Sequence, residues 1–310
     1  MKPLPLLLAP LSALLVGAAE PVPSADPAAV ERVRGHVAFL ASDHLQGRDT
    51  GSPGYAIAAD YVVRELAALG VQPAGTGGGW YQSVPFRRAT HAVPPTITYT
   101  AGGRATALVS GRDVGLRPSI TERDRRIDAP LIFVGRGVSE PRLGIDDYAG
   151  LDVRGKIVVA LSGSPPGIAS DVAAHLYSFK DETAAAKGAA GYLEIEANGG
   201  RRGGVGRGGR PLVDWVGPAG RVASASGLVR SSLALSPEWA ARIFEGAPKS
   251  LEQLRADAAA GRPIRGFELP GRMSIAARSD WQDFRSPNVV GVIPGSDPRL
   301  AAEHIVLMGH

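Results

Sequence analysis

The chain has 310 residues, of which 44% are hydrophobic, a proportion typical of globular proteins. It carries 34 Lys and Arg against 30 Asp and Glu, and this mild formal net charge of +4 does not indicate a nucleic-acid partner. The absence of cysteine excludes disulfide bonds, a thiol nucleophile and a lipid-modified cysteine.

Residues 1–19 have the three parts of a secretory signal peptide. Lys2 supplies the basic start, residues 4–16 form a Leu- and Ala-rich run, and Gly17-Ala18-Ala19 places small residues before the expected cleavage site. A membrane anchor is the alternative, but two prolines interrupt the run, and a spanning helix needs about 20 apolar residues. We therefore expect export to the periplasm or the extracellular space, with no membrane span after cleavage.

Two helices are predicted before any strong strand. Asp26-Pro27 is an N-cap followed by proline at the first helical position, and this helix should run to about Leu45. Ser52-Pro53 repeats the signal, and the second helix should end at Gly70. Helical periodicity predicts a buried face on each. The faces comprise Val30, Val33, Val37, Leu40 and Ala41 in the first helix, and Tyr55, Ala59, Val62, Leu66 and Leu69 in the second.

Strands dominate the middle of the chain. Residues 81–87 and 96–100 alternate apolar and polar side chains, which predicts strands with one wet face. From about Ser110, short apolar runs bounded by glycine predict buried strands with helices between them. The expected strands are 131–134, 156–161, 192–195, 233–236, 272–277, 288–293 and 305–308, and the expected helices are 180–187, 237–244 and 250–260.

A Gly/Arg run over residues 198–210 has no periodicity and is predicted to be a loop. It contains a Gly-x-Gly-x-x-Gly match at Gly204, Gly206 and Gly209, but a dinucleotide site also needs a helix starting there. Arg210-Pro211 does not provide one. An RNA-binding Arg-Gly segment is a further alternative, and a solvated loop is favoured over both.

The candidate metal ligands are histidines. A catalytic zinc site needs three protein ligands that converge on the ion. His36 borders an apolar stripe, and His44 is expected to cap the carbonyls at a helix C-terminus, so both favour structural roles. His310 differs, because it follows a continuous apolar run and Gly309, which leaves room for a close approach. The remaining histidines, 91, 175 and 304, have no local partners in the sequence.

Four segments, in their order along the chain, resemble the secreted di-zinc aminopeptidases of metallopeptidase family twenty-eight. Residues 39–54, with the following helix and residues 71–74, resemble the opening of the family. Residues 156–159 with 184–191 resemble the protease-associated domain that many members insert. Residues 288–295 resemble the return into the peptidase domain, and residues 303–310 resemble the strand that carries the first zinc ligand.

The resemblance implies an α/β zinc-exopeptidase fold interrupted by a β-rich protease-associated domain. Its expected parts are residues 25–109 and 266–310 of the peptidase domain, with the insertion at 110–265. It also implies two zinc ions that activate water toward a peptide or protein substrate, and maps the first zinc ligand to His310. In the family the other ligands and the catalytic carboxylate lie downstream. The chain is therefore expected to be the N-terminal portion of such an enzyme, without catalytic residues and inactive alone.

A non-catalytic binding protein with a protease-associated module is the competing interpretation, since the related transferrin receptor keeps this architecture without catalysis. The sequence leaves open the substrate specificity, the choice between aminopeptidase and carboxypeptidase, and the oligomeric state.

Overall fold

The computed structural model describes residues 26–197, 204–223, 229–300 and 302–309. The predicted signal peptide and His310 lie outside these residues. The chain divides into two compact units, one up to Asp60 and one from Tyr61. Within the described ranges, no helix combines the length and the apolar character needed to cross a membrane.

The first unit begins with helix α1, Pro27–Leu40, whose predicted start is confirmed. The Asp26 carboxylate accepts a hydrogen bond from the main-chain N–H of Ala28 at 3.0 Å. The helix ends before the predicted Leu45, because Ser42 adopts extended backbone and caps a short 3₁₀ helix, η1, Asp43–Arg48. The predicted buried stripe was wrong: α1 has no buried residue, and Val33 and Val37 are 60% and 59% exposed. No described element of this unit covers that face.

Helix α2, Pro53–Ala68, starts where the sequence predicted and passes from the first unit into the second. The Ser52 hydroxyl accepts a hydrogen bond from the N–H of Tyr55 at 3.1 Å. Gly54 is needed for close packing, because a Cβ atom there would lie 1.8 Å from the Leu45 carbonyl oxygen. Leu69, predicted to be buried, follows the helix and is 79% exposed.

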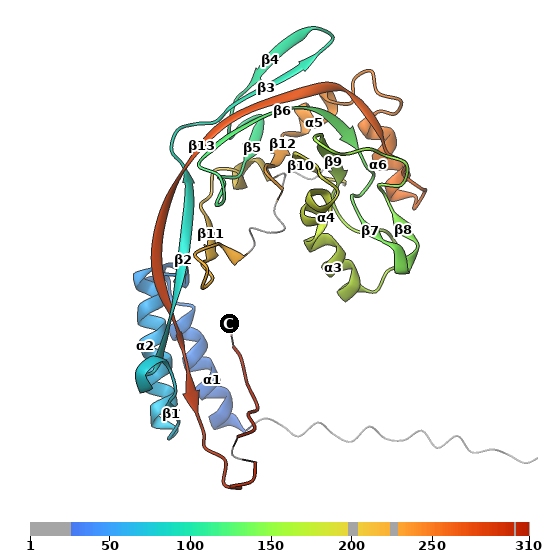
Figure 1. The fold of residues 1–310 in the computed structure, drawn as a ribbon. Coiled ribbons are helices and arrows are strands. Elements are labelled where there is room, and N and C mark those ends of the chain that lie inside the picture. The colour runs from blue at the N-terminus through green and yellow to red at the C-terminus, as the bar shows by residue number, and fades with distance from the viewer. Residues whose placement is uncertain (1–25, 198–203, 224–228, 301, 310) are drawn as a thin grey trace, which may run out of the picture. The chain divides into compact units, whose positions relative to one another are not determined.

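The second unit is built on a mixed ten-stranded sheet (Figure 1). The strand order is β11-β2-β13-β6-β9-β10-β12-β5, and β3 and β4 extend it from β13. The mixed α and β content agrees with the predicted α/β class. The strands are β2 Tyr81–His91, β3 Thr96–Ala101, β4 Arg104–Leu108, β5 Val114–Leu116, β6 Asp124–Phe133, β9 Ile157–Leu161, β10 Gly191–Ile195, β11 Leu212–Trp215, β12 Ser232–Leu235 and β13 Phe267–Val289.

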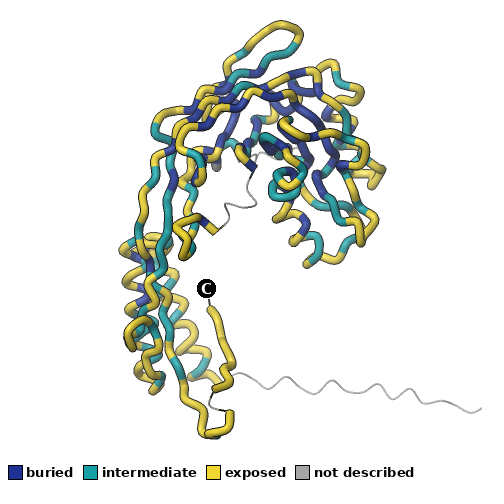
Figure 2. Tube along the Cα trace, viewed as in Figure 1, coloured by how far each residue is buried: buried dark blue, intermediate teal, exposed yellow. Residues whose placement is uncertain are grey.

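Four of these strands, β6, β9, β10 and β12, run parallel, and helices cover the sheet on both faces. All five residues of β9 are buried, as expected for a parallel strand covered on both sides. One face packs against helices α5, Pro237–Arg242, and α6, Leu251–Ala259. The other packs against helix α4, Lys180–Ala186. Figure 2 shows the buried residues concentrated here.

Most predicted strands and helices of this unit exist, with different ends. Ser250 forms the predicted N-cap of α6, completed by a reciprocal hydrogen bond from Gln253. Helix α3, Ser170–Ser178, was not predicted. The smaller elements are β1 Gln72–Pro73, η2 Thr76–Gly78, β7 Ser139–Glu140, η3 Pro141–Leu143, β8 Ile145–Asp146, η4 Gly204–Arg207 and β14 Gly291–Val292.

Strand β13 merges two predicted strands into one of 23 residues. Its first half pairs with β6 and β3, and its second half pairs with β2, from Ser279 opposite His91 to Val289 opposite Tyr81. β1 and β14 continue this pairing. The chain therefore enters and leaves the region between residues 92 and 278 along two adjacent antiparallel strands.

Polar side chains close the far end of the sheet onto its beginning. The carbonyl of Leu116, at the end of β5, lies 2.7 Å from the His91 Nε2 atom of β2. The Arg125 guanidinium of β6 donates to the carbonyls of Arg117 and Arg230, both at 2.7 Å. Strand β5, at the end of the strand order, has no backbone ladder to β2 or β6. The side chains of His91 and Arg125 connect across this gap, and we call them, with the carbonyls of Leu116, Arg117 and Arg230, the seam.

The predicted strand at residues 305–308 was wrong. Residues 303–309 have no regular structure, and Ile305 and Leu307 are 95% and 92% exposed. A strand forms by pairing with a neighbour, and no described strand pairs with this segment.

Candidate functional site

The parallel strands end at one edge of the sheet, where α/β folds commonly bind ligands. Beyond β6 the chain continues to Arg136, beyond β9 to Ser162 and Gly163, and beyond β10 to Glu196. The Ser162 hydroxyl donates to the Glu196 carboxylate at 3.2 Å. The segments that follow three neighbouring strands are therefore joined by polar contacts.

Two cationic side chains bind three successive main-chain carbonyls, the first in the last residue of β9 and the next two directly after it. Lys180, at the start of α4, donates to the Leu161 carbonyl at 3.0 Å and to the Gly163 carbonyl at 2.5 Å. Arg136 donates to the Ser162 carbonyl between them at 2.9 Å. The turn is possible because Gly163 has a φ of +80°, which side chains on L-residues disfavour. We call Lys180, Arg136 and these carbonyls the carbonyl clamp.

Lys180 is a buried cation with one distant acidic partner. Its side chain is 2% exposed, and the Glu194 carboxylate lies 3.9 Å from Nζ. The aromatic ring of Tyr177 lies 5.0 Å from Nζ. Burial lowers the pKa of Lys180 to about 8, because removing the ammonium from water disfavours its charged form, and Glu194 opposes this effect. Lys180 is therefore engaged in holding the main chain.

Asp147 provides a half-buried acid beside Arg136. Its carboxylate accepts hydrogen bonds from the main-chain N–H groups of Arg136, at 3.1 Å, and Val138, at 2.9 Å. Burial nevertheless raises the pKa of Asp147 above its ordinary value. Burial likewise raises the pKa of Tyr148 next to it.

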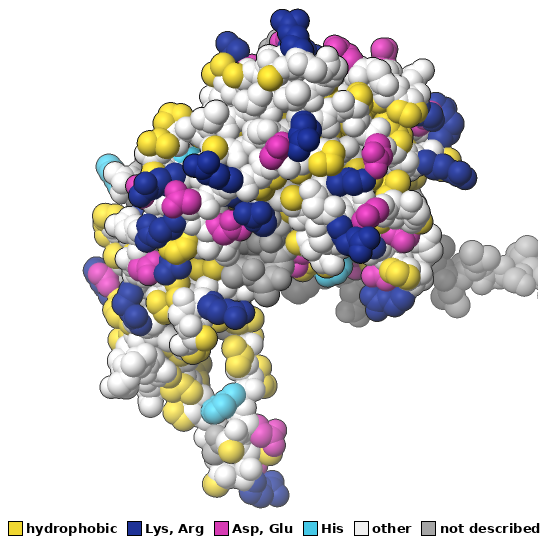
Figure 3. Space-filling model, turned by 45° about the horizontal axis from the view of Figure 1, so that its top comes forward, with side chains coloured by type: hydrophobic (Ala, Val, Ile, Leu, Met, Phe, Trp, Pro, Cys, Tyr) yellow, Lys and Arg dark blue, Asp and Glu magenta, His cyan; other side chains and the backbone are white. Residues whose placement is uncertain are grey.

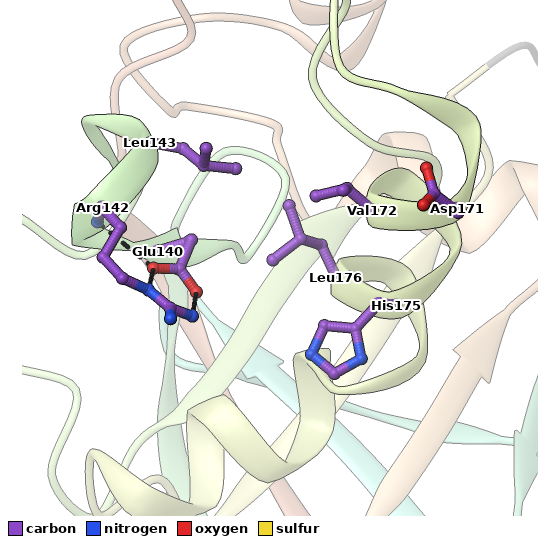
Figure 4. Close-up of a pocket in the computed structure, with 7 residues that line it drawn as sticks. All are labelled: Glu140, Arg142, Leu143, Asp171, Val172, His175 and Leu176. Atoms are coloured by element: carbon purple, nitrogen blue, oxygen red, sulfur yellow. Dashed lines mark hydrogen bonds and ion pairs between the residues drawn. The ribbon is translucent and has the colours of Figure 1, made fainter.

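A pocket of about 500 Å³ lies between η3 and α3, close to this edge (Figure 4). The Glu140–Arg142 pair forms one side, and Asp171 and His175 of α3 contribute the polar atoms of the other. The apolar part of the lining consists of Leu143, Val172 and Leu176. This arrangement combines an apolar surface with ionisable groups at its margin, as in small-molecule and side-chain pockets.

The structure separates the histidines rather than gathering them. His91 serves the seam, with Nε2 at the Leu116 carbonyl and a buried Nδ1 that has no hydrogen-bond partner. His44 was expected at a helix C-terminus, but it lies at the start of η1, where its main-chain N–H donates to Ser42. His304 is exposed. His175 lines the pocket and lies 4.6 Å from the ring of Phe179.

The described residues do not fit a zinc ion. Among them, no group of three or more His, Asp or Glu side chains comes together in a way that could hold a metal. His310, the one ligand that the resemblance maps to this chain, lies outside the described part.

Sequence reasoning missed the carbonyl clamp and the pocket. In the sequence, Lys180 is recognisable only as the first residue of a predicted helix. Its hydrogen-bond partners are main-chain carbonyls 17 and 19 residues away, which no side-chain pattern reveals. The signal that was available is the unusual setting of Lys180, a charged residue directly after an aromatic one at the start of a short helix. His175 has no sequence signal, because the helix that positions it was not predicted.

Charges of both signs mix on the surface drawn in Figure 3. Ion pairs such as Arg87–Asp283 and Arg272–Asp128 place an acid against a base.

The chain matches no protein-family model and no curated protein.

Proposed function

We propose that this chain is the N-terminal part of an exported zinc-dependent aminopeptidase that carries a protease-associated module. The resemblance of four ordered segments to metallopeptidase family twenty-eight supplies the activity. The observation that carries the proposal is the pairing of β2 with β13. An inserted domain must begin and end at neighbouring points of its host, and these two strands meet that requirement.

The region between the two strands has the features of an independent module. It contains the parallel strands, with helices on both faces, and its own extensive core. The carbonyl clamp is internal to it, whereas the seam connects it to His91 of β2. The pairing supports an insertion somewhat longer than residues 110–265, because β3 and β4 belong to the same sheet.

Zinc dependence is tested on the protein purified from its native host. It should release the amino-terminal residue of leucine 4-nitroanilide, lose this activity with a chelator and regain it with Zn²⁺. His310→Ala should lower the bound zinc measured by elemental analysis, whereas His304→Ala, an exposed neighbour, should leave it unchanged. A native protein that binds no zinc and releases no amino-terminal residue would contradict the proposal.

A non-catalytic binding role is the second candidate. It is favoured by the engagement of Lys180 and Arg136 with main-chain carbonyls, which leaves neither side chain free for chemistry. Under this alternative the native protein would still fold and bind a ligand in the pocket, but hydrolysis of the nitroanilide would be absent with and without zinc.

A further inference from the structure

Strand β4, Arg104–Leu108, lies at the rim of the ten-stranded sheet (Figure 1). It pairs with β3 along one side, and no described strand pairs with its other side. Proteins usually protect such an edge with proline, lysine or a bulge, and β4 contains none of these. Its one charged residue, Arg104, stands at the end next to the turn. The outer edge of β4 is therefore open to a further strand.

The other two ends of the sheet are protected. At β11, the main-chain N–H of Trp215 donates to the Asp214 carboxylate at 2.9 Å, and Pro211 directly precedes the strand. At β5, the carbonyl of Leu116 lies 2.7 Å from the His91 Nε2 atom. Side chains therefore occupy main-chain groups at both of these ends, whereas no side chain in the described part of the chain bonds to the outer edge of β4.

The register of the β3–β4 hairpin determines which groups of β4 face outward. Gly102 and Gly103 have φ of +55° and +75° and form the two-residue turn, so the residue pair that flanks this turn is hydrogen-bonded. Hydrogen-bonded and non-hydrogen-bonded pairs alternate along an antiparallel ladder. Ala105 and Ala107 therefore direct their main-chain N–H and C=O groups away from β3, and both residues are exposed.

The sequence of this edge is symmetric. Ala105-Thr106-Ala107 reads the same in both directions, so two copies of β4 can pair antiparallel with their Thr106 residues opposite each other. Ala105 would then exchange both main-chain hydrogen bonds with Ala107 of the second copy, and the two-fold symmetry repeats this pair. The central threonines would form a close pair, which is a favourable combination across strands. Gly103, beyond them, has no side chain to obstruct the second copy.

We propose that β4 of one chain pairs with β4 of a second copy of this chain, about a two-fold axis at Thr106. The contact joins the two ten-stranded sheets into one continuous sheet. Because a two-fold contact uses the same groups on both chains, it closes after two copies and does not propagate into a fibre. The contact is short, so the dimer is weak and reversible. This inference goes beyond the peptidase proposal and depends on neither zinc nor hydrolysis.

The test is sedimentation velocity of the purified chain over a wide range of concentration, and the wild type should shift from monomer to dimer as the concentration rises. Ala107→Pro should suppress the dimer, because proline removes an outward N–H and leaves the bonds to β3 in place. Ala107→Thr keeps this N–H, so it is the matched control and should dimerise. Hydrogen exchange at the Ala107 amide should slow as the dimer forms, whereas the Thr106 amide, which bonds within the hairpin, should not change.

Paired charge variants test the register through exposed side chains that do not contribute to the core. Ala105→Lys combined with Ala107→Lys places like charges opposite each other across the contact. Association should weaken by about twofold to thirtyfold, the effect of two cross-strand pairs. Ala105→Lys combined with Ala107→Glu places opposite charges across the same contact and should restore association.

Three outcomes would overturn the proposal. A wild type that stays monomeric at every concentration would exclude a second copy as the partner of β4. A dimer that is insensitive to Ala107→Pro and to the two lysines would assign the contact to another surface. Equal weakening by both charge combinations would contradict the antiparallel register about Thr106. A chain that dimerises as expected but fails every zinc test would retain this inference and lose the peptidase proposal.

Discussion

The Nζ atom of Lys180 lies 3.0 Å from the main-chain carbonyl oxygen of Leu161, although the side chain is only 2% exposed. A charged donor in the interior holds the last residue of a fully buried strand. The same ammonium also holds Gly163, so one side chain fixes the course of the chain as it leaves β9.

Replacing Lys180 by methionine should destabilise the fold. The substitution keeps the apolar stem but leaves the carbonyls of Leu161 and Gly163 without their donor. Leaving a buried polar group unpaired costs about 1–3 kcal/mol, and the unfolding free energy in urea should fall by roughly that amount. Lys187→Met, at a lysine that is 34% exposed, is the control and should change little. An unchanged midpoint for Lys180→Met would contradict the role of the carbonyl clamp.

Lys180 should also make stability depend on pH. Its pKa is about 8 in the folded chain and 10.5 as an ordinary lysine, so between these values the unfolded chain binds more protons than the folded one. The unfolding free energy contributed by this residue therefore rises with pH across that window and is level below pH 8. Urea titrations at pH 7.5, 9 and 10.5 should show this rise in the wild type and lose it in Lys180→Met. A parallel rise in both proteins would assign it to other groups.

Arg125 should be essential to the seam that closes the sheet. Its side chain is buried, and burial lowers its pKa to about 10, so it stays protonated at neutral pH and costs desolvation. Arg125→Met removes the bonds to Arg117 and Arg230, and hydrogen bonds to charged groups contribute about 1.5–3 kcal/mol each. A loss of about 3 kcal/mol in urea unfolding is expected.

A matched control for Arg125 lies next to it on the same strand. Arg126 is exposed on the opposite face of β6, so Arg126→Met should be nearly neutral. The indole of Trp281 donates to Ser119 near this seam at 2.9 Å. Fluorescence of the chain should therefore report loosening in Arg125→Met and not in Arg126→Met. Equal stability of the two variants would refute the importance of the seam.

Gly271→Ala should disturb β13. A Cβ atom at this position would lie 2.2 Å from a ring carbon of Tyr99, which is itself buried. Overpacking of this kind costs about 1–3 kcal/mol, and the thermal midpoint should drop. Gly295→Ala, with nothing within 4 Å, is the control and should leave the midpoint in place. No change for Gly271→Ala would mean that Tyr99 moves aside freely.

The peptidase proposal also predicts what the 310-residue chain does alone. With added Zn²⁺ it should not release 4-nitroaniline from leucine 4-nitroanilide, because its described residues contain no cluster of metal ligands. The rate is compared with that of zinc in buffer. Turnover above this background that disappears in His310→Ala would contradict the expectation.

Sequence patterns predicted the covered strands best. The run at 156–161 forms β9, because a short, continuously apolar run between glycines is best buried as a strand covered on both faces of a sheet. The same logic failed for α1, where Val33 and Val37 follow helical spacing but are exposed. Helical periodicity indicates which side chains would be buried if another element packed against the helix, but it does not show that such an element is present.

The candidate site was harder to predict for a different reason. Lys180 and Arg136 act on main-chain carbonyls, which carry no residue identity and leave no motif. The pocket depends on η3 and α3 meeting, and these elements are separated by 26 residues of chain, 144–169. A histidine without partners nearby in the sequence, such as His175, can be assigned to a pocket only when the structure shows which distant elements pack around it.

The pairing of β2 with β13 brings the two ends of the region between them close together in space. His91 and Ser279 are directly opposite each other, so their backbones are separated by about one strand spacing, roughly 5 Å. A two-residue hairpin turn could join them after excision of everything between. Such an excision would also remove β11 from its pairing with β2, and it would remove the Leu116 and Ser119 partners of His91 and Ser279.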